Sequence, residues 1–439
     1  IVSIVKYISD LAKNESIVPK QLWCEPLSDK IDWDELKSSL PENLDGIKAL
    51  IGKIDDPKNQ RQFEYIIDML SFRSMFICGN SGSGKSSFIK TMLYSLVTSY
   101  SPEWINYYIL DLSGGSLKNY SRLPHCGAYL TDENEADFLR LMTFLKDIIA
   151  ERKKKFLQND VTTYENYIKA NKMPLILVVI DSYANILSFK SGNSIHSGLY
   201  ESIRESGAYG IRFVLSVNHL SELHSRTRQE IDYRVALRAK DRYEYTDILE
   251  TRATFVVPDV SGRGMCKIDD ETYEYHVAIT DAYEVEQQQS ELLRKRIDAI
   301  CENYKNNGHA LILPMSDGNE RYAEFCDSFE KSRIPLGYHL KDMKKVALPL
   351  QQLYCMAIYL GNKLGRKAVF ENILYAAKKN KMKTIIIKRT SDSVFDSYGD
   401  VVGINTDTEP MIPSVETMCK LEEIINSELI NRAVYRNEF

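Results

Sequence analysis

The stretch GNSGSGKSS, residues 79–87, has the residue types and the spacing of a loop that binds phosphate. Gly79, four further residues and then Gly84, Lys85 and Ser86 fit the pattern G-x-x-x-x-G-K-[ST]. Glycines allow backbone conformations that a Cβ forbids, so successive N–H groups can turn toward one anion. We expect Lys85 to reach the β- and γ-phosphates of a nucleoside triphosphate and the Ser86 hydroxyl to bind Mg²⁺.

A carboxylate that would complete the metal site follows the apolar run LILVVI at 175–180. Asp181 is expected to hold the Mg²⁺ shell through water. Many such ATPases place next a glutamate that orients or deprotonates the attacking water. Here the next residue is Ser182, whose hydroxyl is too weak a base for that task. The sequence therefore predicts ATP and Mg²⁺ binding with slow or absent hydrolysis.

The predicted residues fall into two groups. The metal ligands are Ser86 and, through water, Asp181. The nucleotide-binding set comprises Gly79, Asn80, Ser81, Gly82, Ser83, Gly84, Lys85, Ser86, Ser87 and Asp181. Asn218 ends the apolar stretch GIRFVLSVNHL at 210–220, where it is either a sensor of the γ-phosphate or the cap of a strand. No residue is assigned as catalytic with certainty.

Alternating strands and helices must position these residues. Strands are predicted at 105–115, 174–186 and 210–220, and another, SMFIC, leads into the loop. Helices are predicted at about 86–95 and at 137–156. The pattern indicates an α/β fold, a mostly parallel sheet with helices on both faces, and the phosphate loop makes it one of the P-loop NTPase type.

Composition describes an ordinary globular protein of more than one domain. The 439 residues are 44% hydrophobic and 27% charged, with a formal net charge of −5. That acidic balance weighs mildly against a protein that grips duplex DNA. Eight cysteines occur without a C-x-x-C pair, which indicates reduced thiols. The chain begins at Ile1 without a secretion signal, and we expect a fragment of a longer protein.

A weak internal repeat predicts a duplicated domain. IKALIGKIDDP (47–57) and the loop region return near 333–343 and 355–377 with offsets close to 280 residues. In the second copy Gly361 aligns with Gly79 and Lys367 with Lys85, but Arg366 replaces Gly84 and Ala368 replaces Ser86. This second site is expected to be empty or weakly occupied. The predicted domains are an ATPase module at 1–285, a linker helix at 286–309, and a degenerate, incomplete module at 310–439.

An ordered set of segments resembles the FtsK/SpoIIIE-type ATPase modules of type VII secretion ATPases, the EssC/EccC family. The set is IGKIDDPKNQRQ (51–62), the phosphate loop, the stretch 107–133 with LPHCG, VVIDSYANI (178–186), and the stretch 236–264 with SGRG. The resemblance implies tandem P-loop NTPase (RecA/FtsK-like) domains, namely the second and third of three ATPase modules. They would lie on the cytoplasmic face of a bacterial membrane, in a membrane-anchored motor.

The resemblance also implies partners. The motor would export small helical WXG-type proteins, and its last module would receive a C-terminal signal of the substrate. Other partners would be ATPase modules of the same chain and of neighbouring subunits, and membrane components of the secretion system. Nucleic acid is not expected as a partner, although a DNA-translocating ATPase of the wider FtsK class stays the alternative.

Two arginines gain a role through the resemblance. Arg234 and Arg238 lie where such ATPases place arginines that contact the nucleotide of a neighbouring subunit, so either is a candidate to act in trans. Ordinary surface ion pairing explains both residues equally well. The SGRG segment (261–264) matches a turn of the family, and its expected meaning is structural.

Overall fold

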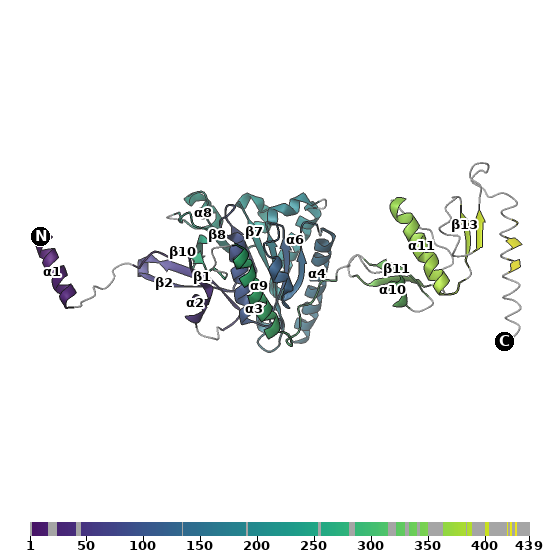
Figure 1. Ribbon diagram of the computed structural model, residues 1–439, viewed down its shortest axis with the longest axis horizontal. Helices are drawn as coiled ribbons and strands as arrows, with labels where there is room; N and C mark the ends of the chain where they lie inside the picture. The colour runs from purple at the N-terminus through teal and green to yellow at the C-terminus, as the bar shows by residue number, and fades with distance from the viewer. Residues whose placement is uncertain are drawn as a thin grey trace. The chain divides into compact units, whose positions relative to one another are not determined.

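The computed structural model describes residues 2–15, 24–40, 45–133, 135–189, 192–252, 256–280, 286–314, 322–329, 333–339, 343–349, 363–382, 384–388 and 400–403, with residues 419, 422, 423, 426 and 427. The chain divides into two compact units, Ile1–Leu313 and Pro314–Phe439 (Figure 1). Among the described helices, none is both long enough and apolar enough to cross a bilayer.

A ten-stranded sheet in the order β2-β1-β10-β9-β8-β3-β7-β6-β4-β5 forms the first unit. Six neighbouring strands run parallel: β8 (Tyr233–Leu237), β3 (Ser74–Cys78), β7 (Ile211–Val217), β6 (Leu175–Asp181), β4 (Ile105–Asp111) and β5 (Cys126–Leu130). The other four pair antiparallel: β9 (Arg263–Ile268), β10 (Glu271–Val277), β1 (Lys48–Asp56) and β2 (Arg61–Asp68). The predicted fold class, a mostly parallel sheet of the P-loop NTPase type, is confirmed.

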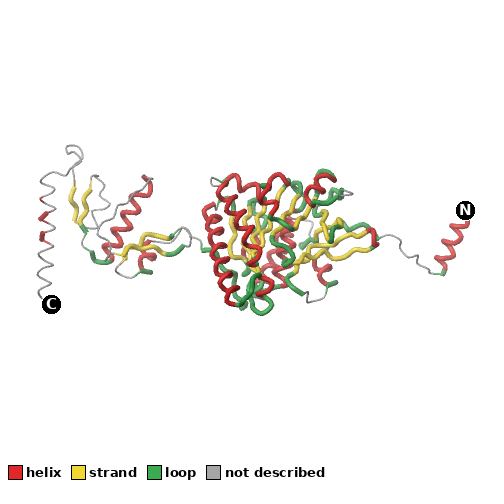
Figure 2. The backbone as a smooth tube through the Cα atoms, turned by 180° about the vertical axis from the view of Figure 1, so that it is seen from behind, coloured by secondary structure: helices red, strands yellow, loops and turns green. Residues whose placement is uncertain are grey.

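Helices cover both faces of this sheet because its central strands are apolar on both sides. In β6, Leu175, Leu177 and Val179 join one core, while Ile176, Val178 and Ile180 join the other. Helices α3 (Lys85–Ser99) and α9 (Glu286–Asn303) contribute to the first core, and Figure 1 shows both across one face. Helices α4 (Glu135–Gln158) and α6 (Gly192–Ser206) contribute to the second core, on the opposite face (Figure 2).

Shorter elements complete the described part of the unit. The α-helices are α1 (Val2–Asn14), α2 (Trp33–Ser38), α5 (Tyr164–Tyr167), α7 (Ser225–Gln229) and α8 (Arg242–Leu249). The 3₁₀ turns are η1 (Pro57–Asn59), η2 (Lys118–Arg122), η3 (Tyr183–Ser188), η4 (Gly207–Tyr209) and η5 (Leu220–Glu222).

The segment predicted as a linker helix packs as α9 on the first unit. Leu293, Ile297 and Ile300 are buried in the core with α3, and Arg296 pairs with Asp34 at 2.6 Å. The chain then follows β5, where the Leu313 N–H donates to the Gly127 carbonyl at 2.9 Å. The compact units therefore divide after Leu313, whereas the sequence analysis placed its domain boundaries at 285 and 309.

The second unit repeats part of the element order of the first. A hairpin of β11 (Arg333–Tyr338) and β12 (Lys345–Pro349) precedes α11 (Lys363–Lys379) and a parallel pair, β13 (Ile385–Lys388) and β14 (Asp400–Gly403), and α10 (Tyr322–Asp327) comes before them all. The hairpin β1–β2, helix α3 and the parallel pair β4–β5 follow the same order. Residues 350–362, between hairpin and helix, lie outside the described part of the chain.

Candidate nucleotide-binding site

The phosphate-loop sequence connects a buried strand to a helix. The strand β3 ends at Cys78, and α3 begins at Lys85 with Gly84 as its cap. Gly82 and Gly84 have φ angles of 73° and 101°, which residues with a Cβ adopt only with strain. A Cβ on Gly84 would also lie 2.7 Å from the Gly262 nitrogen. The two glycines thus allow the loop to turn its N–H groups inward at the positive end of a helix.

Lys85 is folded back into its own loop. Its Nζ donates to the carbonyl oxygens of Gly79 at 2.7 Å and Asn80 at 3.1 Å and to Asn218 Oδ1 at 2.9 Å. Burial lowers the pKa of Lys85, and the negative charge of Asp181 acts against this shift. The ammonium is therefore held at the mouth of the loop by neutral acceptors.

Asn218 connects Lys85 to a carboxylate that the sequence analysis did not select. Glu222 accepts hydrogen bonds from the Asn218 backbone N–H at 2.8 Å and from its side-chain amide at 3.3 Å. Both residues belong to the turn that follows β7. Asn218 is thus a bridge between a cation and an anion, and its side chain lines the loop cavity.

Asp181 lies in a ring of hydroxyl groups. Ser86 and Ser113 each donate to Asp181 Oδ2 at 2.8 Å, and Ser116 donates to the same oxygen at 3.3 Å. Ser216 donates to Oδ1. The residue is 1% exposed, and these hydrogen bonds satisfy polar oxygens that would be costly to bury unpaired. The adjacent hydroxyl of Ser86 and carboxylate of Asp181 are oxygen ligands of the kind Mg²⁺ prefers, so the donor set fits that ion.

The position after Asp181 offers no carboxylate base. Ser182 has a left-handed φ of 64°, and its N–H donates to Ser216 Oγ at 2.8 Å. Of the described residues around the cavity of about 560 Å³ at the loop, only Asp181 bears a carboxylate. The lining is Ser81, Gly82, Gly84, Lys85, Ser86, Ser87, Leu112, Ser113, Asp181, Ser182, Asn185, Asn218 and Ser261.

Three predicted loop residues, Gly79, Asn80 and Ser83, are not among those that line this cavity. Ser83 is fully buried, and its Oγ finds no hydrogen-bond partner among the described residues. Its carbonyl accepts from the Gly262 N–H at 2.9 Å. The SGRG segment therefore packs directly on the phosphate loop, and its Ser261 lines the cavity.

The two arginines occupy different surroundings. Arg234 pairs with Glu250 at 2.5 Å and lies over the Phe76 ring. Arg238 pairs with Asp259 and donates from Nη2 to the carbonyl of Ser81 at 3.3 Å, in the phosphate loop of its own chain. That either arginine contacts the nucleotide of a neighbouring subunit stays a prediction.

The degenerate second site is described only in part. Gly361 lies outside the described residues. Arg366 and Lys367 belong to α11, although their side chains are not described, and Ala368 in the same helix is exposed. In the first unit the helix begins only at Lys85, the residue aligned with Lys367.

Several site residues escaped the sequence analysis. Ser113 and Ser216 reach Asp181 through the register of β4, β6 and β7, whereas Glu222 meets Asn218 within the turn that follows β7. The sequence analysis gave none of the three a role. Asp111 falls inside the strand predicted at 105–115 and was given no role, yet it is the direct neighbour of Asp181 across β4 and β6. It accepts from Ser113 Oγ at 2.9 Å and from Tyr129 OH at 3.0 Å. An aspartate in each of two predicted strands, Asp111 and Asp181, was the sequence signal that could have identified this pair.

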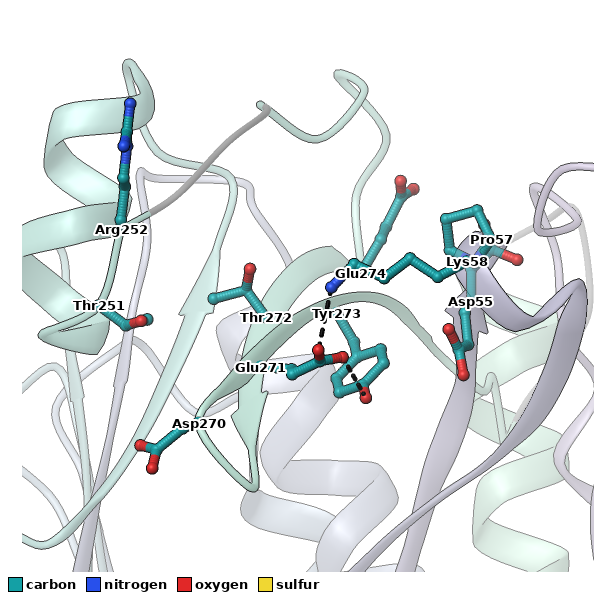
Figure 3. Close-up of a pocket in the computed structure, with 11 residues that line it drawn as sticks. Asp55, Pro57, Lys58, Thr251, Arg252, Asp270, Glu271, Thr272, Tyr273 and Glu274 are labelled. Atoms are coloured by element: carbon teal, nitrogen blue, oxygen red, sulfur yellow. Dashed lines mark hydrogen bonds and ion pairs between the residues drawn. The ribbon is translucent and has the colours of Figure 1, made fainter.

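A second cavity, of about 480 Å³, lies at the antiparallel end of the sheet (Figure 3). Lys58 contacts Glu271 there at 3.0 Å, and the Tyr273 hydroxyl donates to the same carboxylate (Figure 3). The cavity contains none of the predicted site residues. Its described lining also includes no glycine-rich loop at the N-terminus of a helix. We therefore expect phosphate to bind in the first cavity.

Two curated relatives carry names from secretion systems. ESX secretion system protein EccC of Geobacillus thermodenitrificans is 23% identical over 336 residues, which are 74% of this chain and 22% of the relative. Type VII secretion system protein EssC of Staphylococcus aureus (strain MRSA252) is 24% identical over 344 residues, which are 75% of this chain and 23% of the relative. The chain spans less than a quarter of the length of these relatives.

Solved structures of EssC and EccC proteins share the fold. EssC (ATPases 2 and 3) from Geobacillus thermodenitrificans matches with a TM-score of 0.74 at 20% identity, over 94% of this chain and 78% of that one. Thermomonospora curvata EccC (ATPases 2 and 3), in complex with a signal sequence peptide, matches with a TM-score of 0.67 at 20% identity, over 92% of this chain and 76% of that one. The FtsK/SpoIIIE family profile matches residues 48–294, more than half of the chain. The protein therefore belongs to the FtsK/SpoIIIE family, whose P-loop ATPase fold implies nucleotide binding.

Proposed function

We propose that this chain is part of a type VII secretion ATPase and binds Mg-ATP at the phosphate loop of its first unit, with little or no hydrolysis. One observation carries the proposal. Lys85, Ser86 and Asp181 meet at the end of β3 and β6, with the Ser86 hydroxyl 2.8 Å from the carboxylate, while Ser182 occupies the position of the usual base.

Each group has a distinct task in this proposal. The loop N–H groups and Lys85 bind the phosphates, the Ser86 hydroxyl binds Mg²⁺, and Asp181 holds the metal shell through water. Mg-ATP supplies the phosphoanhydride bond on which motors of this kind depend. Without a carboxylate base after Asp181, the bound nucleotide serves assembly or substrate hand-off, and turnover falls to other modules.

The wider assignment rests on the relatives. We propose that the intact protein is membrane-anchored at the cytoplasmic face and exports WXG-type proteins, together with other ATPase modules and membrane components of the system. The second unit is proposed to receive a substrate signal, since one structural neighbour carries a signal sequence peptide. Because α11 begins at Lys363, before the Arg366 that aligns with Gly84, we do not assign a phosphate loop to that unit.

Thermal unfolding of the full chain tests the nucleotide proposal. At about 100 times the dissociation constant, Mg-ATP should stabilise the native state by about 2.7 kcal/mol and raise the melting temperature. Lys85→Ala should remove this rise, whereas Lys367→Ala, the aligned lysine of the second unit, should retain it. Steady-state phosphate release should stay near background. An equal rise in the Lys85→Ala variant would refute the site.

A second experiment separates protein export from DNA translocation. A labelled C-terminal peptide of a WXG-type protein should bind the full chain in a saturable manner, and duplex DNA should not. Preferential binding of duplex DNA that weakens steeply with salt would favour the DNA-translocating alternative.

A further inference from the structure

We infer that Arg238 is a phosphate-binding residue of its own chain, held ready beside the loop by Asp259. The inference rests on the proposed binding of Mg-ATP and adds a second cation to that site. It differs from the trans role that the family resemblance gave to this arginine.

Strand register places Arg238 next to the phosphate loop. In the parallel pair of β3 and β8, Cys78 lies opposite Ala236, and the same register continues beyond both strands. The Asn80 N–H donates to the Arg238 carbonyl at 3.0 Å. The backbone of Arg238 therefore supports the start of the loop, and its position is fixed by the sheet.

The guanidinium contacts the same loop. Its Nη2 lies 3.3 Å from the Ser81 carbonyl, and Nη1 pairs with Asp259. The side chain is 29% exposed. A guanidinium has five N–H donors in a plane, suited to two phosphate oxygens at once. Arg238 does not line the cavity itself, but Ser81, whose carbonyl it contacts, does, so its remaining donors adjoin the place of a bound anion.

Asp259 is a partner that a phosphate can replace. Its side chain is 80% exposed, and exposed ion pairs contribute little to stability. The loop that carries Asp259 is anchored nearby, because Gly262 donates to the Ser83 carbonyl at 2.9 Å. The carboxylate therefore neutralises and orients Arg238 while the loop lacks an anion.

Charge balance supplies the reason for a second cation. Magnesium triphosphate retains about two negative charges, and Lys85 is the lysine that the cavity lining provides. Charge-assisted contacts to phosphate are roughly twice as strong as neutral hydrogen bonds. Arg234 lacks this geometry, since it is paired with Glu250 and stacked on Phe76.

The test measures Mg-ATP binding by calorimetry on the full chain. Arg238→Ala should weaken binding about tenfold, the factor that one lost charge-assisted contact of about 1.4 kcal/mol produces. Asp259→Asn should bind equally well or more tightly, because it removes only the competing carboxylate. Arg242→Ala is the matched control, since Arg242 is exposed and contacts the neighbouring Tyr243 ring, and its affinity should not change.

Mixing distinguishes action in cis from action in trans. Lys85→Ala chains lack a working loop but keep Arg238, so in a trans arrangement they would restore tight binding to Arg238→Ala chains. We expect no restoration. The nucleotide-free melting temperature of Arg238→Ala should stay within about 2 °C of the unaltered chain, which separates phosphate binding from a structural role.

Each other outcome overturns the inference. Unchanged affinity in Arg238→Ala removes the phosphate contact, restoration on mixing makes the arginine a trans residue, and equal loss in Asp259→Asn makes the pair structural. If the unaltered chain binds no Mg-ATP, both the proposed function and this inference are wrong. If the unaltered chain binds Mg-ATP and Arg238→Ala binds it equally well, only the inference is wrong.

Discussion

The Nζ of Lys85 lies 2.9 Å from Oδ1 of Asn218, and this contact fixes the orientation of the asparagine amide. Lysine can only donate, and the Glu222 carboxylate on the other side can only accept. The amide oxygen must therefore face Lys85 and its NH₂ must face Glu222, as observed. The bridge presents a neutral acceptor to the cation that is expected to bind phosphate.

Asn218→Asp should weaken Mg-ATP binding about tenfold or more, because it places a negative charge in the cavity and pairs it with Lys85. The new carboxylate also repels Glu222. A matched control exists on the surface, where Lys169 donates to Asn166 Oδ1 at 3.0 Å in an exposed contact. Asn166→Asp should leave affinity unchanged. Calorimetry checks both variants, and equal affinity in the two would contradict the electrostatic argument.

Gly84→Ala should destabilise the fold more than Gly82→Ala. Both glycines have positive φ angles, so each substitution carries a conformational cost of about 1 kcal/mol. At Gly84 the new Cβ would also lie 2.7 Å from the Gly262 nitrogen, whereas nothing lies within 4 Å of a Cβ at Gly82. Urea unfolding of the two variants measures the difference. Identical losses would mean that the SGRG turn can move away from the loop.

Local patterns in the sequence predicted the elements that build the site. The apolar runs before Gly79 and Asp181 became β3 and β6, and the segment after the loop became α3. Those predictions succeeded because strand, loop and helix are adjacent in the chain. The predicted linker helix at 286–309 was harder to place, because it is largely polar and its buried apolar side chains are few, among them Leu293, Ile297 and Ile300. Only packing shows that α9 is part of the first unit.

Contacts between distant segments could not be predicted in this way. Ser216 reaches Asp181 because β6 and β7 are neighbours, and Arg238 reaches Ser81 because β8 pairs with β3. Both depend on strand order and register, which no spacing within a motif encodes. The contact of Gly262 with Ser83 joins residues still further apart in the chain. The phosphate loop could be predicted from its motif, but the residues that surround it could be identified only from the order and register of the strands.

Ser182→Glu should raise ATP hydrolysis by at least about tenfold, since a positioned general base contributes about 10²–10⁴ in rate and an introduced one only part of that. Ser182 lines the cavity beside Asp181. Its left-handed φ of 64° applies equally to glutamate and glutamine, so Ser182→Gln is the matched control with equal size and no base. Phosphate release measures turnover. Robust hydrolysis by the unaltered chain would show that another residue already serves as the base.

His125, in the LPHCG segment, should make the first unit sensitive to acid. The ring is fully buried, with Nε2 2.8 Å from the Tyr100 carbonyl and Nδ1 without a partner among the described residues. Its edge contacts Tyr304, just beyond α9, at a centroid distance of 5.1 Å. Burial lowers the pKa of His125 from 6.5 to about 4. The folded state therefore retains the neutral imidazole where the unfolded chain already binds a proton.

The sign of the pH effect follows from that difference. The unfolded state binds more protons between pH 6.5 and about 4, so the free energy of unfolding falls as the pH falls through this window. The loss due to His125 amounts to at most about 3 kcal/mol. His125→Gln keeps an N–H donor for Tyr100 but cannot titrate, so its stability should fall less over the same range. Urea unfolding from pH 7 to 4 compares the two chains and cancels the shared contributions of other groups, such as the buried His276. Parallel stability curves for the two chains would mean that His125 is protonated in the fold or that the α9 contact opens to admit water.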